Sequence, residues 1–176
     1  IYVQDLWPEN VEIITGIKSK VVIGPIGRMV DYIYKRCSKI FVTSNSFKES
    51  IHKRGVAKEK IEYLPQYAEV FYVPLKKASF HEIPSDDQFN LIFAGNIGQA
   101  QGLDILPKAA AEIKKREYDQ SIRFNIVGNG RYMDKLLSII DDLDVKALFN
   151  FIPRQPAERI PAFFAATDCA FLSLSD

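Results

Sequence analysis

The stretch Phe89–Leu106, FNLIFAGNIGQAQGLDIL, decides the fold of this chain. Its apolar residues Leu91, Ile92 and Phe93 predict a short strand, which runs directly into a turn that contains three glycines. An amphipathic helix is predicted to open from that turn. A strand, a glycine turn and a helix in this order bring backbone N–H groups and a helix N-terminus up to a phosphate. The stretch therefore predicts α/β architecture with a candidate phosphate site.

The composition is that of a soluble globular protein: 176 residues, 47% hydrophobic and 26% charged. A formal net charge of +1 and the lack of a long basic run give no argument for nucleic acid as a partner. No apolar run approaches the roughly 18 residues that a membrane span requires. Cys37 and Cys169 have neither metal-ligand nor disulfide-framework spacing, so both are predicted to be small buried apolar groups in a reducing compartment.

The chain begins with IYVQDLWP, without an initiator Met, and it stops within the apolar run CAFLSLSD. We therefore expect an excerpt of a longer cytoplasmic protein.

Short apolar strands alternate with helical patterns along the whole chain. Strands are predicted at 1–3, 39–43, 61–64, 89–94, 122–127, 148–151 and from 168 onward, and helices at 18–36, 47–53, 102–116, 133–140 and 157–166. This alternation is typical of parallel α/β sheets. Periodicity disappears between 65 and 87, where Pro74 and Pro84 lie, and this break predicts two such units.

Two further turns follow strands of the second unit, Gly128-Asn129-Gly130 and Pro153-Arg154-Gln155-Pro156. The carboxyl ends of parallel strands meet at one edge of a sheet, where α/β proteins bind ligands, so we expect both turns beside the turn Gly95–Gly102. The run GNIGQAQG fits neither the dinucleotide fingerprint nor the P-loop. A second interpretation stays open, in which the glycine turns hold no ligand and Arg154 is a solvated surface residue.

The first unit offers one candidate carboxylate, Asp5, which follows a predicted strand. It could act as a base or bind hydroxyl groups; alternatively it caps the following segment, with Trp7 in the core. His52 and His81 are predicted to be plain surface residues. The helix at 18–36 mixes cations with apolar side chains, which favours a packed helix with snorkelling cations, while contact with an anionic membrane surface stays open.

Taken in order, five segments resemble the bacterial glycosyltransferases of family 4. They are DLWPEN (5–10), FVTSNSFKESIHKRGVAKEKIEYLPQYAEVFYVP (41–74), FAGNIGQAQGLDIL (93–106), FNIVGNGRYMDKL (124–136) and FIPRQPAERIPAFFAATDCAFLSL (151–174). Each motif is loose, but the ordered set is specific and covers essentially the whole chain. The resemblance is strongest to the subgroup that includes the N-acetyl-L-fucosamine transferases of capsule and O-antigen assembly.

This resemblance implies the GT-B fold, with parts of two Rossmann-like parallel-sheet domains. Residues 1–66 would be the C-terminal part of the N-terminal (acceptor) domain, 67–88 the linker, and 89–176 the first part of the C-terminal (donor) domain. The implied reaction is retaining transfer of a sugar from a nucleotide-sugar, expected to be a UDP-sugar, to a lipid-linked or saccharide acceptor in surface polysaccharide synthesis. The implied location is cytoplasmic, with peripheral contact to the inner face of the membrane.

The resemblance also implies roles for individual residues. The donor-binding set is Gly95, Asn96, Ile97, Gly98, Gln101 and Gly102 at the diphosphate, Gly128, Asn129 and Gly130 near the nucleotide, and Arg154 and Gln155 at the base and ribose. Asp5 lies where the family often has a histidine, so it is the candidate catalytic carboxylate. No cofactor and no divalent metal are expected, because GT-B enzymes stabilise the leaving diphosphate with helix dipoles and cationic side chains.

Two departures from the family pattern qualify these expectations. Many relatives carry Arg and Lys where this chain has Asn96 and Gln101, so the missing charge should come from backbone amides or from a cation outside this chain. The family's E-x7-E element is expected after Asp176, so the fragment alone should be inactive. The alternatives that stay open are a GT-B UDP-sugar epimerase or phosphorylase and a non-catalytic nucleotide-sensing or interaction domain.

Overall fold

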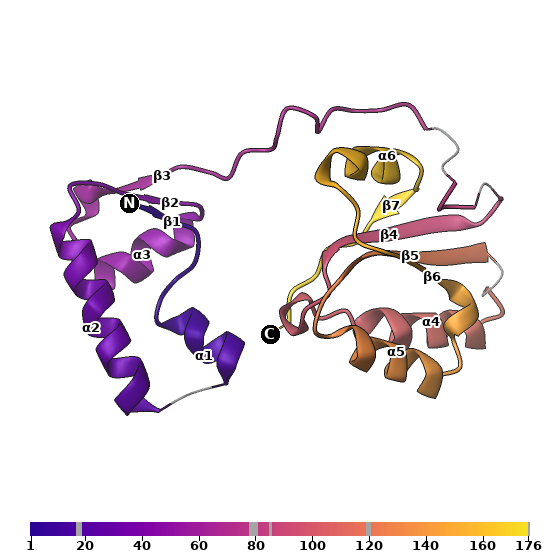
Figure 1. Cartoon of the computed structure of the whole chain (residues 1–176), viewed down its shortest axis with the longest axis horizontal. Coiled ribbons are helices and arrows are strands. Elements are labelled where there is room, and N and C mark those ends of the chain that lie inside the picture. Colours follow the sequence, from indigo (N-terminus) through magenta and orange to yellow (C-terminus); the bar gives the residue numbers. More distant parts are fainter. Residues whose placement is uncertain (17–18, 78–80, 85, 119–120, 176) are drawn as a thin grey trace. The chain divides into compact units, whose positions relative to one another are not determined.

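The computed structural model describes residues 1–16, 19–77, 81–84, 86–118 and 121–175. The chain divides into two compact units, Ile1–Ala68 and Glu69–Asp176. Each unit has its own parallel sheet and its own hydrophobic core (Figure 1). The expectation of an α/β fold with parallel sheets is therefore confirmed.

Unit 1 is a three-stranded sheet in the order β1-β2-β3, with all strands parallel. Its strands are β1 (Tyr2–Val3), β2 (Ile40–Val42) and β3 (Ile61–Tyr63), and its helices are α1 (Glu9–Thr15), α2 (Lys20–Arg36), α3 (Asn45–Lys53) and the 3₁₀ turn η1 (Lys58–Lys60). Ser44 caps α3, because its Oγ accepts a hydrogen bond from the Ser46 N–H at 3.3 Å.

The core of unit 1 lies between its sheet and the helices α2 and α3. It consists of Val3, Val30, Tyr34, Ile40, Val42, Ile51, Val56 and Ile61. Arg54, at the end of α3, ties that helix to α2 through an ion pair with Asp31 at 2.8 Å and a hydrogen bond to the Gly27 carbonyl at 2.9 Å. These contacts hold two helices that are separated by β2 in the sequence.

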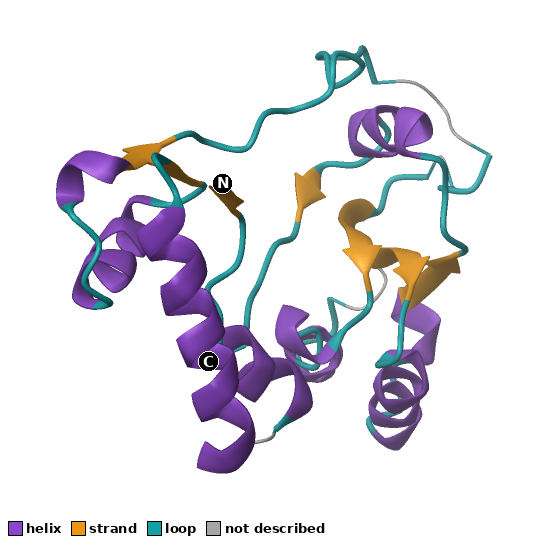
Figure 2. Cartoon of the chain, turned by 60° about the vertical axis from the view of Figure 1, so that its left-hand side comes forward, coloured by secondary structure: helices purple, strands orange, loops and turns teal. Residues whose placement is uncertain are grey.

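Unit 2 is a four-stranded parallel sheet in the order β6-β5-β4-β7. Its strands are β4 (Phe89–Asn96), β5 (Ile122–Asn129), β6 (Phe149–Ile152) and β7 (Cys169–Ala170). Its helices are α4 (Ile105–Lys115), α5 (Met133–Asp142) and α6 (Ile160–Ala165), with 3₁₀ turns η2 (Gln99–Gln101), η4 (Lys146–Leu148) and η5 (Ala157–Arg159). Figures 1 and 2 show α4 and α5 on one face of this sheet and α6 on the other.

The pairing of β4 with β5 runs over the full length of both strands, from Phe89↔Ile122 to Asn96↔Asn129. The sequence predicted that these strands end at 94 and 127. Both continue for two further residues, because the parallel ladder includes the pair Gly95↔Gly128. The residue expected to begin the first glycine turn, Gly95, is therefore a strand residue.

Three asparagines cross the α6 face of the sheet on adjacent strands. The Asn125 amide donates to Asn90 Oδ1 at 3.0 Å, and the Asn150 amide donates to Asn125 Oδ1 at 2.9 Å. Asn90 and Asn125 are buried, and a buried amide is tolerated only when its hydrogen bonds are made. This ladder ties β4, β5 and β6 together, and the apolar strand pattern did not predict it.

Part of the expected linker 67–88 is attached to the sheet of unit 2. Ile83 is buried in the core under α6. Arg123 makes a two-pronged ion pair with Asp86, at 3.1 and 2.7 Å, and Arg159 pairs with Glu82 at 2.7 Å. The polypeptide therefore enters the sheet along a path held by ion pairs.

The structure shows how exposed the two cysteines and the two histidines are. Cys37 is half-buried but Cys169 is exposed, so the prediction that both are buried is wrong for Cys169. His81 is exposed, whereas His52 is half-buried with its Nδ1 2.9 Å from the Val56 carbonyl oxygen, a contact within the α3 turn.

Within the described ranges, no helix has the length and apolar character needed to cross a membrane.

The stability of unit 2 should fall in acid because of Asp168. Hydrogen bonds from Lys77 Nζ at 2.6 Å and from the Asn90 N–H at 2.8 Å hold the pKa of Asp168 below its usual value. A carboxyl with a lowered pKa stabilises the fold above its unfolded pKa, about 3.9, and that contribution is lost as pH falls through the folded value. We expect Asp168→Asn to lower the urea midpoint at neutral pH and to flatten its decline toward about pH 3.

Circular dichroism during urea unfolding at both pH values measures this effect. Asp142→Asn, at an exposed carboxylate in the last turn of α5, is the control and should keep the wild-type decline. A decline as steep in Asp168→Asn as in the wild type would contradict the prediction.

Candidate functional site

A pocket of about 780 Å³ opens at the carboxyl ends of β4, β5 and β6. Its walls come from the end of β4 (94–96), from the end of β5 and the turn after it (127–131), and from the segment after β6 (154–155). Tyr72, Ala157 and Ile160 complete the lining. This edge of a parallel sheet is where ligands bind in α/β proteins, because loops that follow adjacent strands converge there.

The pocket brings together seven of the eleven predicted donor-binding residues. Those that line it are Gly95, Asn96, Gly128, Asn129, Gly130, Arg154 and Gln155. The other four, Ile97, Gly98, Gln101 and Gly102, are not among its lining residues. The turn after β5 and the segment after β6 thus contribute as the sequence predicted. The expected turn Gly95–Gly102 contributes only Gly95 and Asn96, which are the last residues of β4.

The backbone amides of the turn after β4 already donate within the protein. The Ile97 N–H donates to the Asn129 carbonyl at 2.9 Å, and the Gly98 N–H lies 3.0 Å from the Asn96 carbonyl oxygen and 3.1 Å from Gln101 Oε1. The Gly102 N–H closes the 3₁₀ turn η2. Ile97 is fully buried. The predicted phosphate cradle would therefore have to exchange existing hydrogen bonds for those of a ligand.

The strict requirement for glycine lies at Gly128, near the end of β5, and at Gly130, in the turn after it. Gly128 has φ +145°, and a Cβ there would overlap the Gly95 carbonyl oxygen. A Cβ on Gly130 would overlap the Ile97 carbonyl. At Gly98, by contrast, a Cβ would meet only the ends of two side chains, which can move. The backbones of the two turns approach each other more closely than side chains would allow.

The turn after β5 is held against Ile97 by backbone hydrogen bonds on both sides. Ile97 donates to the Asn129 carbonyl at 2.9 Å, and its own carbonyl accepts from the Tyr132 N–H at 3.0 Å. The Asn129 side chain accepts from the Gly130 N–H at 2.7 Å. The turn after β5 is therefore held in place by hydrogen bonds within the protein.

Among the lining residues that were not predicted from the sequence, two have side chains that can donate hydrogen bonds, Arg131 and Tyr72. Arg131 directly follows the second glycine turn, and this position was the available signal. Tyr72 was assigned to the linker; its ring packs against Phe71, with 5.0 Å between the ring centroids. Its place at the pocket follows from tertiary structure alone.

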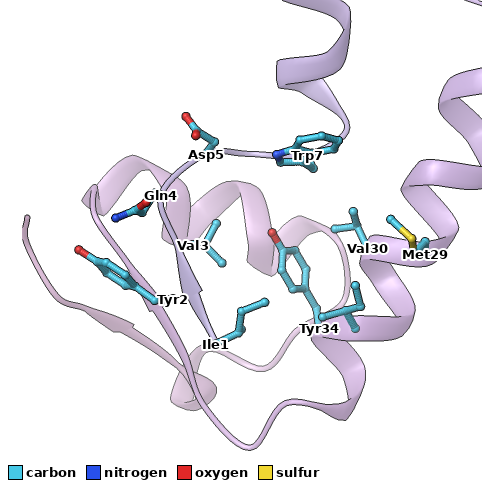
Figure 3. A pocket seen from close by; sticks show the side chains of 10 residues that line it. Ile1, Tyr2, Val3, Gln4, Asp5, Trp7, Met29, Val30 and Tyr34 are labelled. Atoms are coloured by element: carbon cyan, nitrogen blue, oxygen red, sulfur yellow. The ribbon is translucent and has the colours of Figure 1, made fainter.

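Asp5 lines a separate pocket of about 430 Å³ in unit 1, formed by β1, the segment after it and α2. In Figure 3 the Tyr34 hydroxyl points toward the segment that carries Asp5 and Trp7. Burial raises the pKa of Tyr34, so this hydroxyl is a neutral hydrogen-bonding group. Trp7 is 45% exposed and α1 is capped at Pro8 without a side-chain hydrogen bond, so Asp5 does not cap α1 and Trp7 is not core. A carboxylate and an exposed indole beside an apolar wall suit binding of a sugar hydroxyl and ring face.

Among the residues that the structure describes, no group of three or more His, Cys, Asp or Glu side chains is placed to hold a metal ion. The expectation that neither a metal nor a cofactor is needed stays a prediction.

The family model described as "Glycosyl transferases group 1" matches residues 75–176, more than half of the chain. The match spans β4 to β7 and so includes almost every residue that lines the larger pocket; Tyr72 lies just before it.

Similar proteins carry related names. The chain is 25% identical over 132 residues to WcaI of Escherichia coli K12, named as a candidate colanic acid biosynthesis glycosyl transferase, and this covers 72% of the chain and 31% of WcaI. It is 32% identical over 82 residues to a D-inositol 3-phosphate glycosyltransferase of Pseudarthrobacter chlorophenolicus, covering 46% of the chain and 20% of that protein. The chain thus spans about a third or less of the length of these curated relatives.

Solved structures confirm the fold class. The crystal structure of Anabaena HepE in complex with UDP and glucose matches 96% of this chain and 44% of HepE, with a TM-score of 0.71 and 16% identity. WaaG, a glycosyltransferase involved in lipopolysaccharide biosynthesis, matches 98% of this chain and 49% of WaaG, with a TM-score of 0.70 and 15% identity. The chain therefore shares its α/β fold with parallel sheets with these two proteins.

The close contact between the two turns predicts unequal effects of alanine at their glycines. Gly128→Ala must displace the Gly95 carbonyl and adopt a strained φ, so we expect it to lower the free energy of unfolding by about 2 kcal/mol or more. Gly98→Ala, the control, should lower it by less than about 1 kcal/mol. Urea unfolding of both variants measures the difference; equal losses would refute this steric argument.

Proposed function

Because this chain belongs to the group 1 glycosyl transferases, we propose that the whole protein is a retaining glycosyltransferase of surface polysaccharide synthesis. Its donor is a UDP-sugar, and its acceptor is a lipid-linked or other saccharide in the assembly of capsule or O-antigen. Within the family we assign it to the subgroup that resembles the N-acetyl-L-fucosamine transferases. The name of WcaI, which refers to colanic acid biosynthesis, supports a role in bacterial polysaccharide assembly.

The observation that carries this proposal is the pocket at the carboxyl ends of β4, β5 and β6, which lies in the part of the chain that the family model matches. The polar groups on its walls include Asn96, Asn129, Arg154 and Gln155. We assign Arg154 and Gln155 to the base and ribose, and the ends of β4 and β5 to the phosphates. HepE, a protein of the same fold, forms a complex with UDP, which supports a uridine nucleotide as the ligand.

Chemistry at this site requires stabilisation of the leaving nucleoside diphosphate. As the glycosidic bond to the β-phosphate breaks, negative charge develops on the leaving oxygen, and hydrogen-bond donors aimed at that position lower the barrier. The Asn96 amide, at the end of β4, is one such donor. In the proposed mechanism no divalent metal takes part, and the charge is balanced by side chains and helix dipoles.

The acceptor is assigned to unit 1, which we propose to be the C-terminal part of the acceptor domain; unit 2 is then the first part of the donor domain. The pocket around Asp5, Trp7 and Tyr34 supports this division, because it offers a carboxylate and aromatic rings. Asp5 is the proposed catalytic carboxylate. The chain alone is expected to bind the donor nucleotide and to lack transferase activity.

Calorimetry with UDP tests the donor assignment. We expect the 176-residue chain to bind UDP. Because Arg154 is assigned to the nucleoside, we expect Arg154→Gln to raise the Kd for uridine and the Kd for UDP by about tenfold each. Arg116→Gln removes an exposed cation at the end of α4 that is not among the pocket residues, so it is the control. No heat of binding at millimolar UDP would overturn the proposal.

We propose peripheral contact of α2 with the inner face of the cytoplasmic membrane. On this helix Val21, Met29 and Tyr32 are 83%, 54% and 58% exposed, while cations such as Arg28 and Arg36 lie among them. Exposed apolar side chains with neighbouring cations suit the surface of an anionic bilayer.

Co-sedimentation with vesicles that contain phosphatidylglycerol tests this contact. A Met29→Ser, Tyr32→Ser variant should lose most of the bound fraction, whereas Val70→Ser, an exposed apolar residue of unit 2, should not. Equal binding of all three proteins would rule out α2 as the contact.

A further inference from the structure

We propose that Arg131 is the cation that binds the diphosphate of the donor. The inference rests on the proposed function and names the charge that Asn96 and Gln101, both neutral, do not supply. The family pattern predicted that this charge comes from backbone amides or from a cation outside this chain. The structure offers a cation inside the chain, in the turn directly after β5, the strand that pairs with β4 up to its last residue, Asn96. Arg131 lines the pocket directly after Gly130.

The backbone around Arg131 is fixed more firmly than that of an ordinary surface arginine. Asn129, before it, accepts from the Ile97 N–H at 2.9 Å, and Tyr132, after it, donates to the Ile97 carbonyl at 3.0 Å. Gly130 packs so closely on Ile97 that no side chain fits between them. The Tyr132 side chain packs on the core under α5. Arg131 is thus held at the pocket edge between two anchored neighbours, and less entropy is lost when it binds a ligand.

The place of Arg131 relative to α5 argues against a stabilising role. It stands immediately before Tyr132, the N-cap of α5, whose first residue is Met133. The N-terminus of a helix carries partial positive charge, so a cation there is unfavourable and an anion is favourable. An arginine at this position slightly lowers the free energy of unfolding of the ligand-free protein, and a bound anion would reverse that effect.

Arg131 makes no ion pair with any carboxylate in the part of the chain that the structure describes. In unit 2, Arg123 is paired with Asp86 and Arg159 with Glu82. Over the ranges that the structure describes, neither Arg131 nor Arg154 makes an ion pair, and both line the same pocket. Two uncompensated guanidinium groups at one pocket create a positive potential, which suits a ligand with several negative charges.

The chemistry of the two groups matches the two ends of a nucleoside diphosphate. A guanidinium donates two parallel hydrogen bonds to a phosphate, which a single amide cannot do. Arg131 follows β5 beside the end of β4, where the phosphates are proposed to lie, and Arg154 follows β6, beside the proposed base and ribose site. Arg131 should therefore recognise phosphate, whether from a UDP-sugar or from free pyrophosphate, and should be indifferent to the nucleoside.

Calorimetry with UDP, uridine and inorganic pyrophosphate separates these roles in the 176-residue chain. We expect Arg131→Gln to raise the Kd for UDP and for pyrophosphate by about tenfold or more and to leave the Kd for uridine unchanged. Lys135→Gln is the matched control, because it removes the same charge one helical turn away from Arg131. Lys135 is exposed and is not among the pocket residues. Lys135→Gln should change each Kd by less than about twofold. Without ligand, Arg131→Gln should melt at the wild-type temperature or slightly above it, whereas the rise in Tm with UDP should be lost.

The outcomes distinguish this inference from the proposed function. If the wild type binds UDP and Arg131→Gln binds it equally well, or loses UDP and uridine to the same extent, the inference is overturned and the donor site stands. If the wild type binds pyrophosphate through Arg131 but binds neither UDP nor uridine, the anion site stands and the nucleotide site does not. Binding of none of the three ligands overturns both.

Discussion

The parallel pairing of β4 with β5 is the interaction on which unit 2 depends. It runs from Phe89↔Ile122 to Asn96↔Asn129, and it is anchored near its start by the buried amides of Asn90 and Asn125. Because a shift in register would separate these amides, the asparagines specify the alignment of the strands. The same alignment brings Gly128 against Gly95 at the far end. The geometry of the pocket therefore depends on the hydrogen bond between Asn90 and Asn125, which is buried near the other end of the strands.

This close approach changes where a ligand can be bound. The turn after β4 uses its own amides to hold the turn after β5, through Ile97 and Asn129, so those amides are occupied. Polar side chains must then supply more of the hydrogen bonds to a ligand in the pocket. The turn after β5 is the better placed of the two, because it is anchored on both sides and carries a cation, Arg131, whereas the end of β4 carries the neutral Asn96.

Local patterns predicted the elements of both units well, and long-range contacts explain where they failed. The serine cap of α3 and the β/α alternation follow from hydrogen bonding and periodicity over a few residues. The strand ends at Asn96 and Asn129 were missed because glycine normally marks a turn, whereas here it permits two strands to remain paired. The asparagine ladder was missed because an isolated asparagine in a strand has no visible partner in the sequence.

By itself, the sequence determined the α/β class, the order of strands and helices, and the three turns that converge at one sheet edge, because each follows from local periodicity and turn chemistry. Family resemblance added the expected donor site. Tertiary structure decided which residues of those turns reach the pocket. It placed Gly128 and Gly130, rather than Gly98, at the steric contact, because only the register of β4 on β5 brings their backbones together. It also brought Arg131 and Tyr72 to the pocket, since those positions depend on contacts between segments far apart in the chain.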